Sequence, residues 1–169
     1  FVADMIEGRK INLLNYKAQD APLTEKIASK RDLVDRIKST KSSIAIQTSG
    51  TTGNPKEIVH EVSKLLQDTK QNNKSSVWLY AYNPFHMGGV QVLLQALVNG
   101  DSIVYGYKKD RESLLTHIER HKITHISATP TFYRLLLPFK KKYPTVIRVT
   151  VGGERADSNT LKIIKSMFP

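Results

Sequence analysis

The chain has 169 residues, of which 40% are hydrophobic, and this is enough for one packed domain with a sizeable core. It contains no cysteine, which excludes a disulfide framework, a thiolate metal site and a cysteine nucleophile and favours a cytoplasmic protein. Its formal net charge of +11 favours polyanionic partners. The basic residues are dispersed without interleaved aromatics, so we expect no nucleic-acid binding, and the longest apolar run is too short for a membrane span.

The spacing of apolar residues predicts strands and helices in alternation from about residue 23 onward. We expect strands at 43–47, 57–59, 77–82, 102–105, 123–128 and 146–151. We expect helices at 23–38, 62–69, 90–97, 110–118, 129–137 and 157–167. Asp110 and Thr129 are suited to cap helices, and Pro130 is suited to a first helical turn.

This order of elements predicts an α/β fold, with a parallel sheet covered by helices on both faces and joined by right-handed crossovers. Ligands of such sheets bind at the carboxyl ends of the strands. Three segments of interest follow predicted strands, after residues 47, 82 and 151. We therefore expect all three to lie at one edge of the sheet.

The first of these segments, residues 48–56, reads Thr-Ser-Gly-Thr-Thr-Gly-Asn-Pro-Lys and has the composition of a phosphate-binding loop. Glycines let backbone N–H groups close on an anion, hydroxyls add hydrogen bonds, and Lys56 adds a positive charge. A Walker A loop is excluded because Pro55 precedes the lysine and Glu57 follows it, where that motif has glycine and a hydroxyl residue. The alternative from composition alone is a solvated loop that binds nothing.

The same string resembles, residue by residue, the phosphate loop of the adenylate-forming (AMP-binding) superfamily, which includes acyl-CoA synthetases, peptide synthetase adenylation domains and luciferases. Two further segments resemble motifs of that superfamily in the same order: 83–89, Asn-Pro-Phe-His-Met-Gly-Gly, and 152–154, Gly-Gly-Glu. Residues 124–131 resemble its scaffold element in which a strand runs into a helix. The resemblance covers about residues 44–154. Glu57 stands where the superfamily usually has glycine, and this departure makes the subfamily harder to assign but does not affect the superfamily.

The resemblance implies roles for the loop residues, which would hold the β- and γ-phosphates of ATP with Mg²⁺ assisting: Thr48, Ser49, Gly50, Thr51, Thr52, Gly53 and Lys56. It also implies that Gly152, Gly153 and Glu154 line the adenine side of the site. No metal ligand is assigned, because the histidines at 117, 121 and 125 lack accompanying carboxylates.

His86 would border the acyl pocket. Amino-acid-activating members of the superfamily carry an acidic residue at the corresponding position, where it pairs with the substrate ammonium. A histidine cannot supply that fixed negative charge, so the resemblance implies a carboxylic acid without an α-amino group. Taken alone, His86 is more simply explained as a histidine in a polar turn at the start of a helix.

The resemblance thus implies an ATP-dependent ligase that converts an acyl or aryl acid to acyl-AMP and pyrophosphate. The acyl group would then pass to a thiol, either coenzyme A or the pantetheine of an acyl-carrier protein. The alternatives are an amino-acid adenylation domain of a peptide synthetase and a catalytically inactive nucleotide-binding module. A kinase or NTPase is disfavoured, because neither glycine-loop motif of those enzymes is present.

Members of the superfamily are several hundred residues long, so we expect this chain to be part of the large N-terminal domain of such an enzyme. Residues 1–42 are expected to belong to an upstream part of that domain, and residues 43–169 to form one incomplete α/β subdomain. The superfamily's later motifs, including its catalytic lysine, have no counterpart in these residues. The isolated chain is therefore expected to be inactive.

Overall fold

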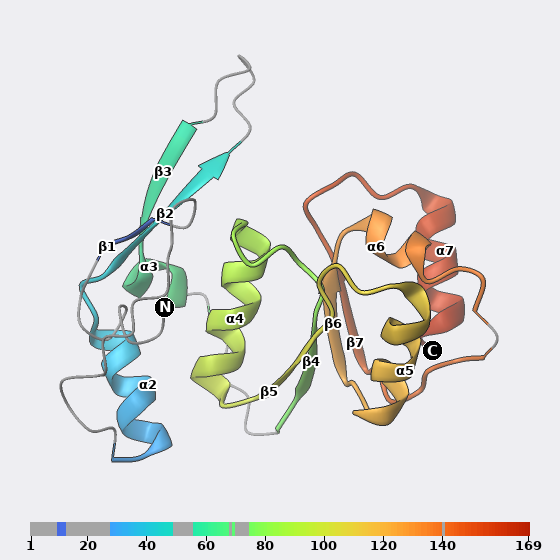
Figure 1. The fold of residues 1–169 in the computed structure, drawn as a ribbon, viewed down its shortest axis with the longest axis horizontal. Helices are drawn as coiled ribbons and strands as arrows, with labels where there is room; N and C mark the ends of the chain where they lie inside the picture. The colour runs from blue at the N-terminus through green and yellow to red at the C-terminus, as the bar shows by residue number, and fades with distance from the viewer. Residues whose placement is uncertain (1–9, 13–27, 49–55, 68, 70–74, 140) are drawn as a thin grey trace. The chain divides into compact units, whose positions relative to one another are not determined.

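A computed structural model of the chain describes residues 10–12, 28–48, 56–67, 69, 75–139 and 141–169 (Figure 1). Contacts divide the chain into two compact units. The first unit comprises residues 1–71 with 85–87, and the second comprises residues 72–84 with 88–169. This division does not coincide with the boundary at residue 43 that the sequence suggested, which stays a prediction.

The first unit contains a three-stranded mixed sheet in the order β1-β2-β3. Its elements are β1 (Lys10–Asn12), α2 (Lys30–Ser39), β2 (Ser43–Thr48), β3 (Lys56–Glu61) and α3 (Val62–Gln67). Strand β2 runs parallel to β1 and antiparallel to β3. The two strands expected around the glycine-rich loop are therefore confirmed, but they form an antiparallel hairpin in a sheet that they share with β1.

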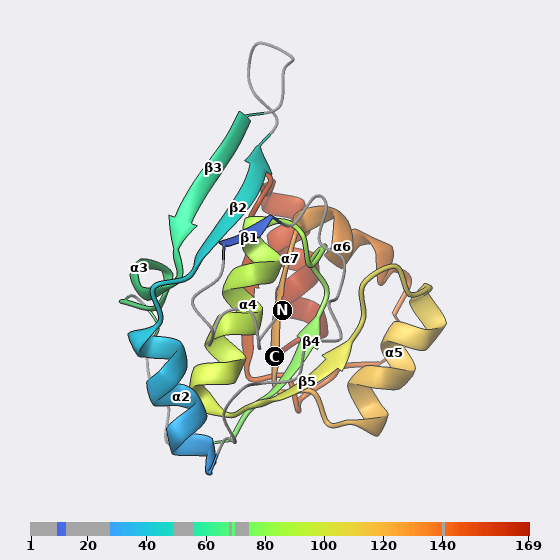
Figure 2. The same cartoon turned by 60° about the vertical axis from the view of Figure 1, so that its left-hand side comes forward.

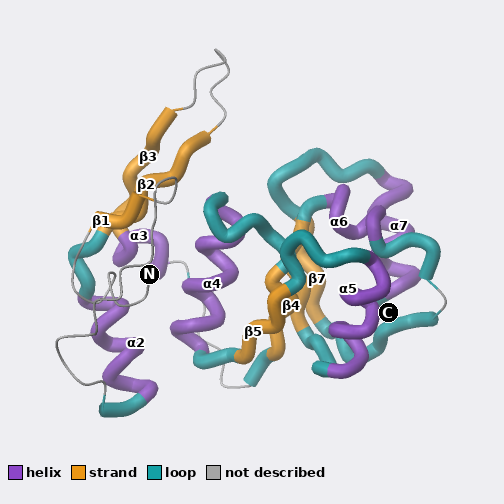
Figure 3. The backbone as a smooth tube through the Cα atoms, in the orientation of Figure 1, coloured by secondary structure: helices purple, strands orange, loops and turns teal. Residues whose placement is uncertain are grey.

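The second unit contains a four-stranded sheet in the order β5-β4-β6-β7, in which every neighbouring pair is parallel. Its strands are β4 (Val77–Tyr80), β5 (Ser102–Tyr105), β6 (His125–Ala128) and β7 (Arg148–Val151), and its helices are α4 (Met87–Asn99), α5 (Arg111–Arg120), α6 (Pro130–Leu135) and α7 (Ser158–Met167). Figure 3 shows this alternation of strand and helix. It confirms the predicted α/β fold with a parallel sheet.

The two faces of this sheet pack against different helices. On one face, Trp78 and Tyr80 of β4 form a buried cluster with Val92 and Ala96 of α4. On the other face, Leu79 of β4 belongs to the main core, together with side chains of α5, α6 and α7. Figures 1 and 2 show α4 on one side of the sheet and the other three helices opposite. The alternation along β4 explains why its sequence is continuously apolar.

Local signals in the sequence set where three helices begin. The side chains of Asp110, Thr129 and Asp157 each accept a hydrogen bond from the backbone N–H three residues later. The caps predicted at Asp110 and Thr129 are thus confirmed, and Pro130 occupies the first turn of α6. In the described part of the chain, no helix is long and apolar enough to cross a membrane.

One prediction about the arrangement of the loops is wrong. The segments after residues 82 and 151 follow β4 and β7, which are parallel strands of one sheet. The segment after residue 47 instead follows β2, which belongs to the other sheet. The three motif segments therefore do not share one sheet edge, because β2 pairs with β1 and β3 and with no strand of the four-stranded sheet.

Candidate functional site

The predicted phosphate loop joins the two strands of the β2–β3 hairpin. Thr48 and Lys56, the first and last residues of the motif, are paired across these strands. Lys56 is exposed at the start of β3. Residues 49–55 lie outside the described residues, and they include the predicted ligands Ser49, Gly50, Thr51, Thr52 and Gly53. The hairpin thus places the motif's cation at the base of the loop, and the phosphate-binding role stays a prediction.

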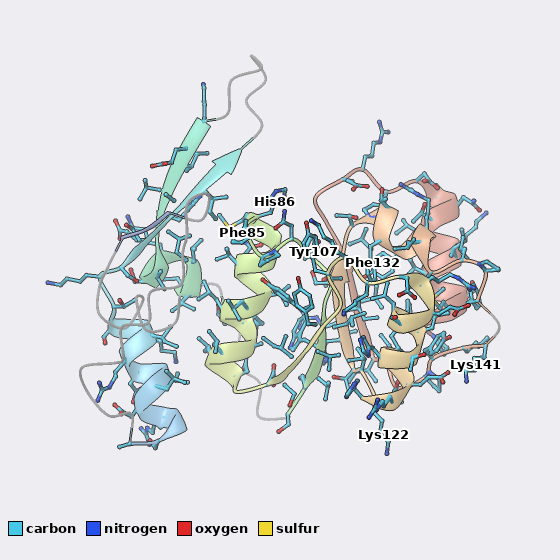
Figure 4. The ribbon with its side chains drawn as sticks, viewed as in Figure 1. Phe85, His86, Tyr107, Lys122, Phe132 and Lys141 are labelled. Carbon is cyan, nitrogen blue, oxygen red and sulfur yellow. The ribbon has the colours of Figure 1, made fainter. Side chains whose placement is uncertain are left out.

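His86 lies immediately before α4 and is exposed, as is its neighbour Phe85 (Figure 4). The first turn of α4 packs closely against the backbone of the segment that precedes His86. A Cβ atom on Gly89 would lie 2.2 Å from the carbonyl oxygen of Asn83, so only glycine fits there. The glycine in the motif therefore has a structural reason, and the turn presents His86 at the surface. Its role beside an acyl pocket stays a prediction.

Residues 152–154 turn sharply away from the carboxyl end of β7. Gly153 has a φ of +81°, a left-handed conformation that side chains disfavour. The N–H of Gly152 donates to the carbonyl of Ala128 on the neighbouring strand at 3.1 Å. A Cβ atom on Gly152 would lie 3.3 Å from the hydroxyl of Tyr82. The turn is therefore bare main chain held close to the ends of β6 and β4, which fits the approach of a flat heterocycle.

Tyr82 is a member of this site that sequence reasoning did not single out. Its ring is half-buried and lies beside glycines from two segments, since a Cβ on Gly88 would be 3.1 Å from the ring and one on Gly153 would be 4.0 Å from it. Burial is the largest cause that raises the pKa of the Tyr82 hydroxyl, the hydrogen bond with Ser127 lowers it, and the charge of Glu154 raises it. The net shift of this pKa is upward from the ordinary tyrosine value, so the hydroxyl, which is protonated at neutral pH in any tyrosine, is still harder to ionise here. The signal that the sequence offered for Tyr82 was its place as the aromatic residue that ends the apolar run 77–82.

The carboxylate of Glu154 points to α6. The hydroxyl of Thr131 donates to Glu154 Oε2 at 2.6 Å, and the Thr131 N–H donates to the same oxygen at 3.4 Å. The Thr131 hydroxyl is also the largest cause that lowers the pKa of Glu154. Glu154 is therefore ionised and engaged by α6, and its predicted contact with the nucleotide stays a prediction.

Metal-ligating side chains do not gather in the described residues. No group of three or more His, Asp or Glu side chains there could hold a metal ion. The His117 and His121 rings pack against each other with centroids 5.5 Å apart and a tilt of 54°, whereas the His125 ring packs against Trp78 at 4.8 Å with a tilt of 42°. His117 and His121 thus contact each other, whereas His125 packs in a different place, against Trp78.

The chain matches the AMP-binding enzyme family over residues 6–169 and belongs to that family. It is 30% identical over 170 residues to D-lysergyl-peptide-synthetase subunit 2 of Claviceps purpurea, a match that covers 94% of this chain and 13% of that protein. It is 32% identical over 117 residues to the 2-succinylbenzoate–CoA ligase of Bacillus subtilis, covering 63% of this chain and 23% of that protein. The chain thus spans less than a quarter of either relative.

Solved structures support the same assignment. The O-succinylbenzoate coenzyme A synthetase of B. subtilis in complex with AMP matches with a TM-score of 0.60 and 26% identity, covering 75% of this chain and 34% of that one. The same enzyme in complex with ATP and magnesium ion matches with a TM-score of 0.62 and 23% identity, covering 92% and 32%. The predicted family and the predicted α/β fold are confirmed.

Proposed function

We propose that this chain is part of an ATP-dependent ligase that activates an acyl or aryl carboxylic acid and transfers it to a thiol. The observation that carries the proposal is the Thr48–Lys56 motif at the end of the β2–β3 hairpin, in a chain of the AMP-binding enzyme family. The 2-succinylbenzoate–CoA ligases among its relatives support this class of reaction. The absence of cysteine is in keeping with a cytoplasmic enzyme.

The reaction would proceed in two displacements. A carboxylate oxygen of the acid attacks the α-phosphorus of ATP, the bond to the β-phosphate bridging oxygen breaks, and pyrophosphate leaves with acyl-AMP remaining. The thiol sulfur, after loss of its proton, then attacks the acyl carbonyl carbon and expels AMP. Coenzyme A is the first candidate thiol, and the pantetheine of an acyl-carrier protein is the second.

The chain's own residues would act by binding and by electrostatic stabilisation. Lys56 and the backbone N–H groups of residues 48–53 would hold the β- and γ-phosphates, where negative charge grows as pyrophosphate leaves. Gly152 and Gly153 would lie against the adenine, since their main chain carries no side chain. Magnesium would neutralise phosphate charge, and we assign no ligand to it among the described residues.

An amino acid is the second candidate substrate. It is favoured by the match to D-lysergyl-peptide-synthetase subunit 2, which covers 94% of this chain. The exposed His86 argues for an acyl or aryl acid instead, because a histidine offers no fixed negative charge to a substrate ammonium. We give the residue at this position more weight than the relative's name, since the matched segment is only 13% of that protein.

A panel of carboxylic acids tests the proposal. The full-length protein would be incubated with ATP, magnesium and each acyl acid, aryl acid or free amino acid, and pyrophosphate release would be measured with and without coenzyme A. We expect at least one acyl or aryl acid to be preferred over every amino acid. A strong preference for an amino acid would support the second candidate, and no release with any acid would contradict the ligase proposal.

A further inference from the structure

The side chain of Arg134 on α6 contacts both acidic residues of the segment that connects β7 to α7. Its Nη1 atom lies 3.5 Å from Asp157 Oδ2, and its Nη2 atom lies 3.9 Å from Glu154 Oε2. The side chain is 44% exposed, so Arg134 lies at the surface. One planar group therefore spans the two ends of residues 154–157.

Hydroxyl groups complete the network around this guanidinium. Nη2 donates to the Thr131 hydroxyl oxygen at 3.0 Å, and the Thr131 hydroxyl in turn donates to Glu154. Nη1 donates to the hydroxyl oxygen of Thr160 at 3.1 Å, and that hydroxyl donates to Asp157 at 2.8 Å. Each acid is thus reached by Arg134 directly and through a threonine. A lysine could not make both sets of contacts, because it has a single terminal nitrogen.

The glycine turn depends on contacts made by its neighbours. Gly152 and Gly153 have no side chains with which to fix their own position, and Gly153 has a positive φ of 81°. The turn is held on one side by the hydrogen bond from Gly152 N–H to Ala128. On the other side it is continuous with Glu154, whose carboxylate is held by Thr131 and Arg134. Loss of Arg134 would therefore loosen the side of the turn that leads into α7.

We propose that Arg134 is a positioning residue that fixes the 152–154 turn for the nucleotide by tying Glu154 and Asp157 to α6. This inference rests on the proposed function, which places adenine against that turn. Arg134 acts through Glu154 and the main chain, without contact to the reacting atoms. Its loss should weaken ATP binding more than it slows the chemical steps.

The kinetic experiment compares Arg134→Gln with Arg155→Gln in the full-length protein. Arg155 is exposed in the same connecting segment, so its replacement removes the same charge without removing the contacts to Glu154 and Asp157. We expect Arg134→Gln to raise KM for ATP about two- to fivefold, the range expected for partly exposed ion pairs, with kcat and KM for the acid nearly unchanged. Arg134→Lys should restore part of the loss, and Arg155→Gln should match the wild type.

Hydrogen–deuterium exchange provides a readout that does not depend on activity. In Arg134→Gln, the amides of residues 152–157 should exchange faster than in the wild type, whereas those of α5 should not change. The positioning role would be overturned if the two glutamine variants had equal effects, or if KM for ATP rose without faster exchange. It would also be overturned if kcat fell while KM for ATP and KM for the acid rose to the same extent. If the wild type activates no acid, the proposed function fails, and exchange alone then decides whether Arg134 fixes the turn.

Discussion

Thr48 and Lys56 lie directly opposite each other on the antiparallel strands β2 and β3. This register closes residues 49–55 into a loop whose two ends are held by the hairpin ladder. Strand β2 below the loop is anchored in the first unit by Ile44, Ala45 and Ile46, all of which are buried, whereas Ile58 and Val59 of β3 are exposed. The register therefore places Lys56 opposite the first residue of the motif, at the point where β3 begins.

Lys56→Ala should slow acyl-adenylate formation by the full-length protein. The ammonium group would stabilise the negative charge that develops on the departing pyrophosphate, and removal of one such group costs on the order of a hundredfold in rate. Pyrophosphate exchange with a saturating acid measures the effect. Lys64→Ala is the matched control, since Lys64 is an exposed lysine paired with Glu61 in the same unit. An unchanged exchange rate in Lys56→Ala would remove the phosphate-binding role from this residue.

Gly89→Ala should strongly destabilise the turn before α4. The added Cβ would lie 2.2 Å from the carbonyl oxygen and 2.9 Å from the carbonyl carbon of Asn83, and both atoms belong to the main chain. We expect the free energy of unfolding to fall by about 3 kcal/mol, the upper part of the range for overpacking. Gly88→Ala is the control, because its Cβ would be 3.1 Å from the Tyr82 ring, which can shift. Urea unfolding measures the free energy of unfolding of both variants. Equal decreases in the two variants would contradict the prediction.

The elements with strong local signals could be predicted from the sequence. Asp110, Thr129 and Pro130 mark helix starts because a cap depends only on the residues that follow it within one turn. The apolar run at β4 is continuous because both of its faces are covered. The segment at Lys10–Asn12 had no comparable signal, and it is a strand because it pairs with β2 more than thirty residues away.

The candidate site was predicted less completely than the fold, because its contacts join residues that are far apart in the sequence. The string at 152–154 identified a glycine turn, but not the partners of Glu154, because Thr131 is 23 residues away along the chain. The division of the strands between two sheets was also missed, since β2 and β4 are both short apolar runs and alternation alone does not specify their partners. Tyr82 and Arg134 gain their significance only in the folded unit, where β4 and β7 flank β6 in one sheet and α6 packs on that sheet.

Tyr133→Phe should weaken the connection between α6 and the sheet. The buried hydroxyl of Tyr133 lies 2.8 Å from the carbonyl oxygen of Thr150 and 3.2 Å from that of Ile126, which belong to neighbouring strands. Loss of this hydrogen bond should reduce the free energy of unfolding by about 1 kcal/mol and leave the secondary structure unchanged. Tyr107→Phe, which alters a half-buried tyrosine after β5, is the control in thermal unfolding. Equal stability of Tyr133→Phe and the wild type would show that the hydroxyl contributes nothing.

His125 should make the stability of the second unit sensitive to mild acid. The residue is 6% exposed, its ring packs against Trp78 with the two centroids 4.8 Å apart, and its Nδ1 atom lies 2.8 Å from the Thr124 hydroxyl oxygen. Burial is the largest cause that lowers its pKa, the charge of Arg148 lowers it further, and Asp101 opposes both.

The folded protein therefore holds His125 neutral at pH values where the unfolded chain, with a histidine pKa near 6.5, already binds a proton. Unfolding then takes up a proton, so the free energy of unfolding should decrease as the pH falls below about 6.5. Urea unfolding followed by circular dichroism between pH 7.5 and 5 measures this slope. His125→Phe keeps a ring against Trp78 and should flatten the slope, whereas His121→Gln, at an exposed position, should retain it. If His125→Phe retained the full slope, the acid sensitivity would have to come from other groups.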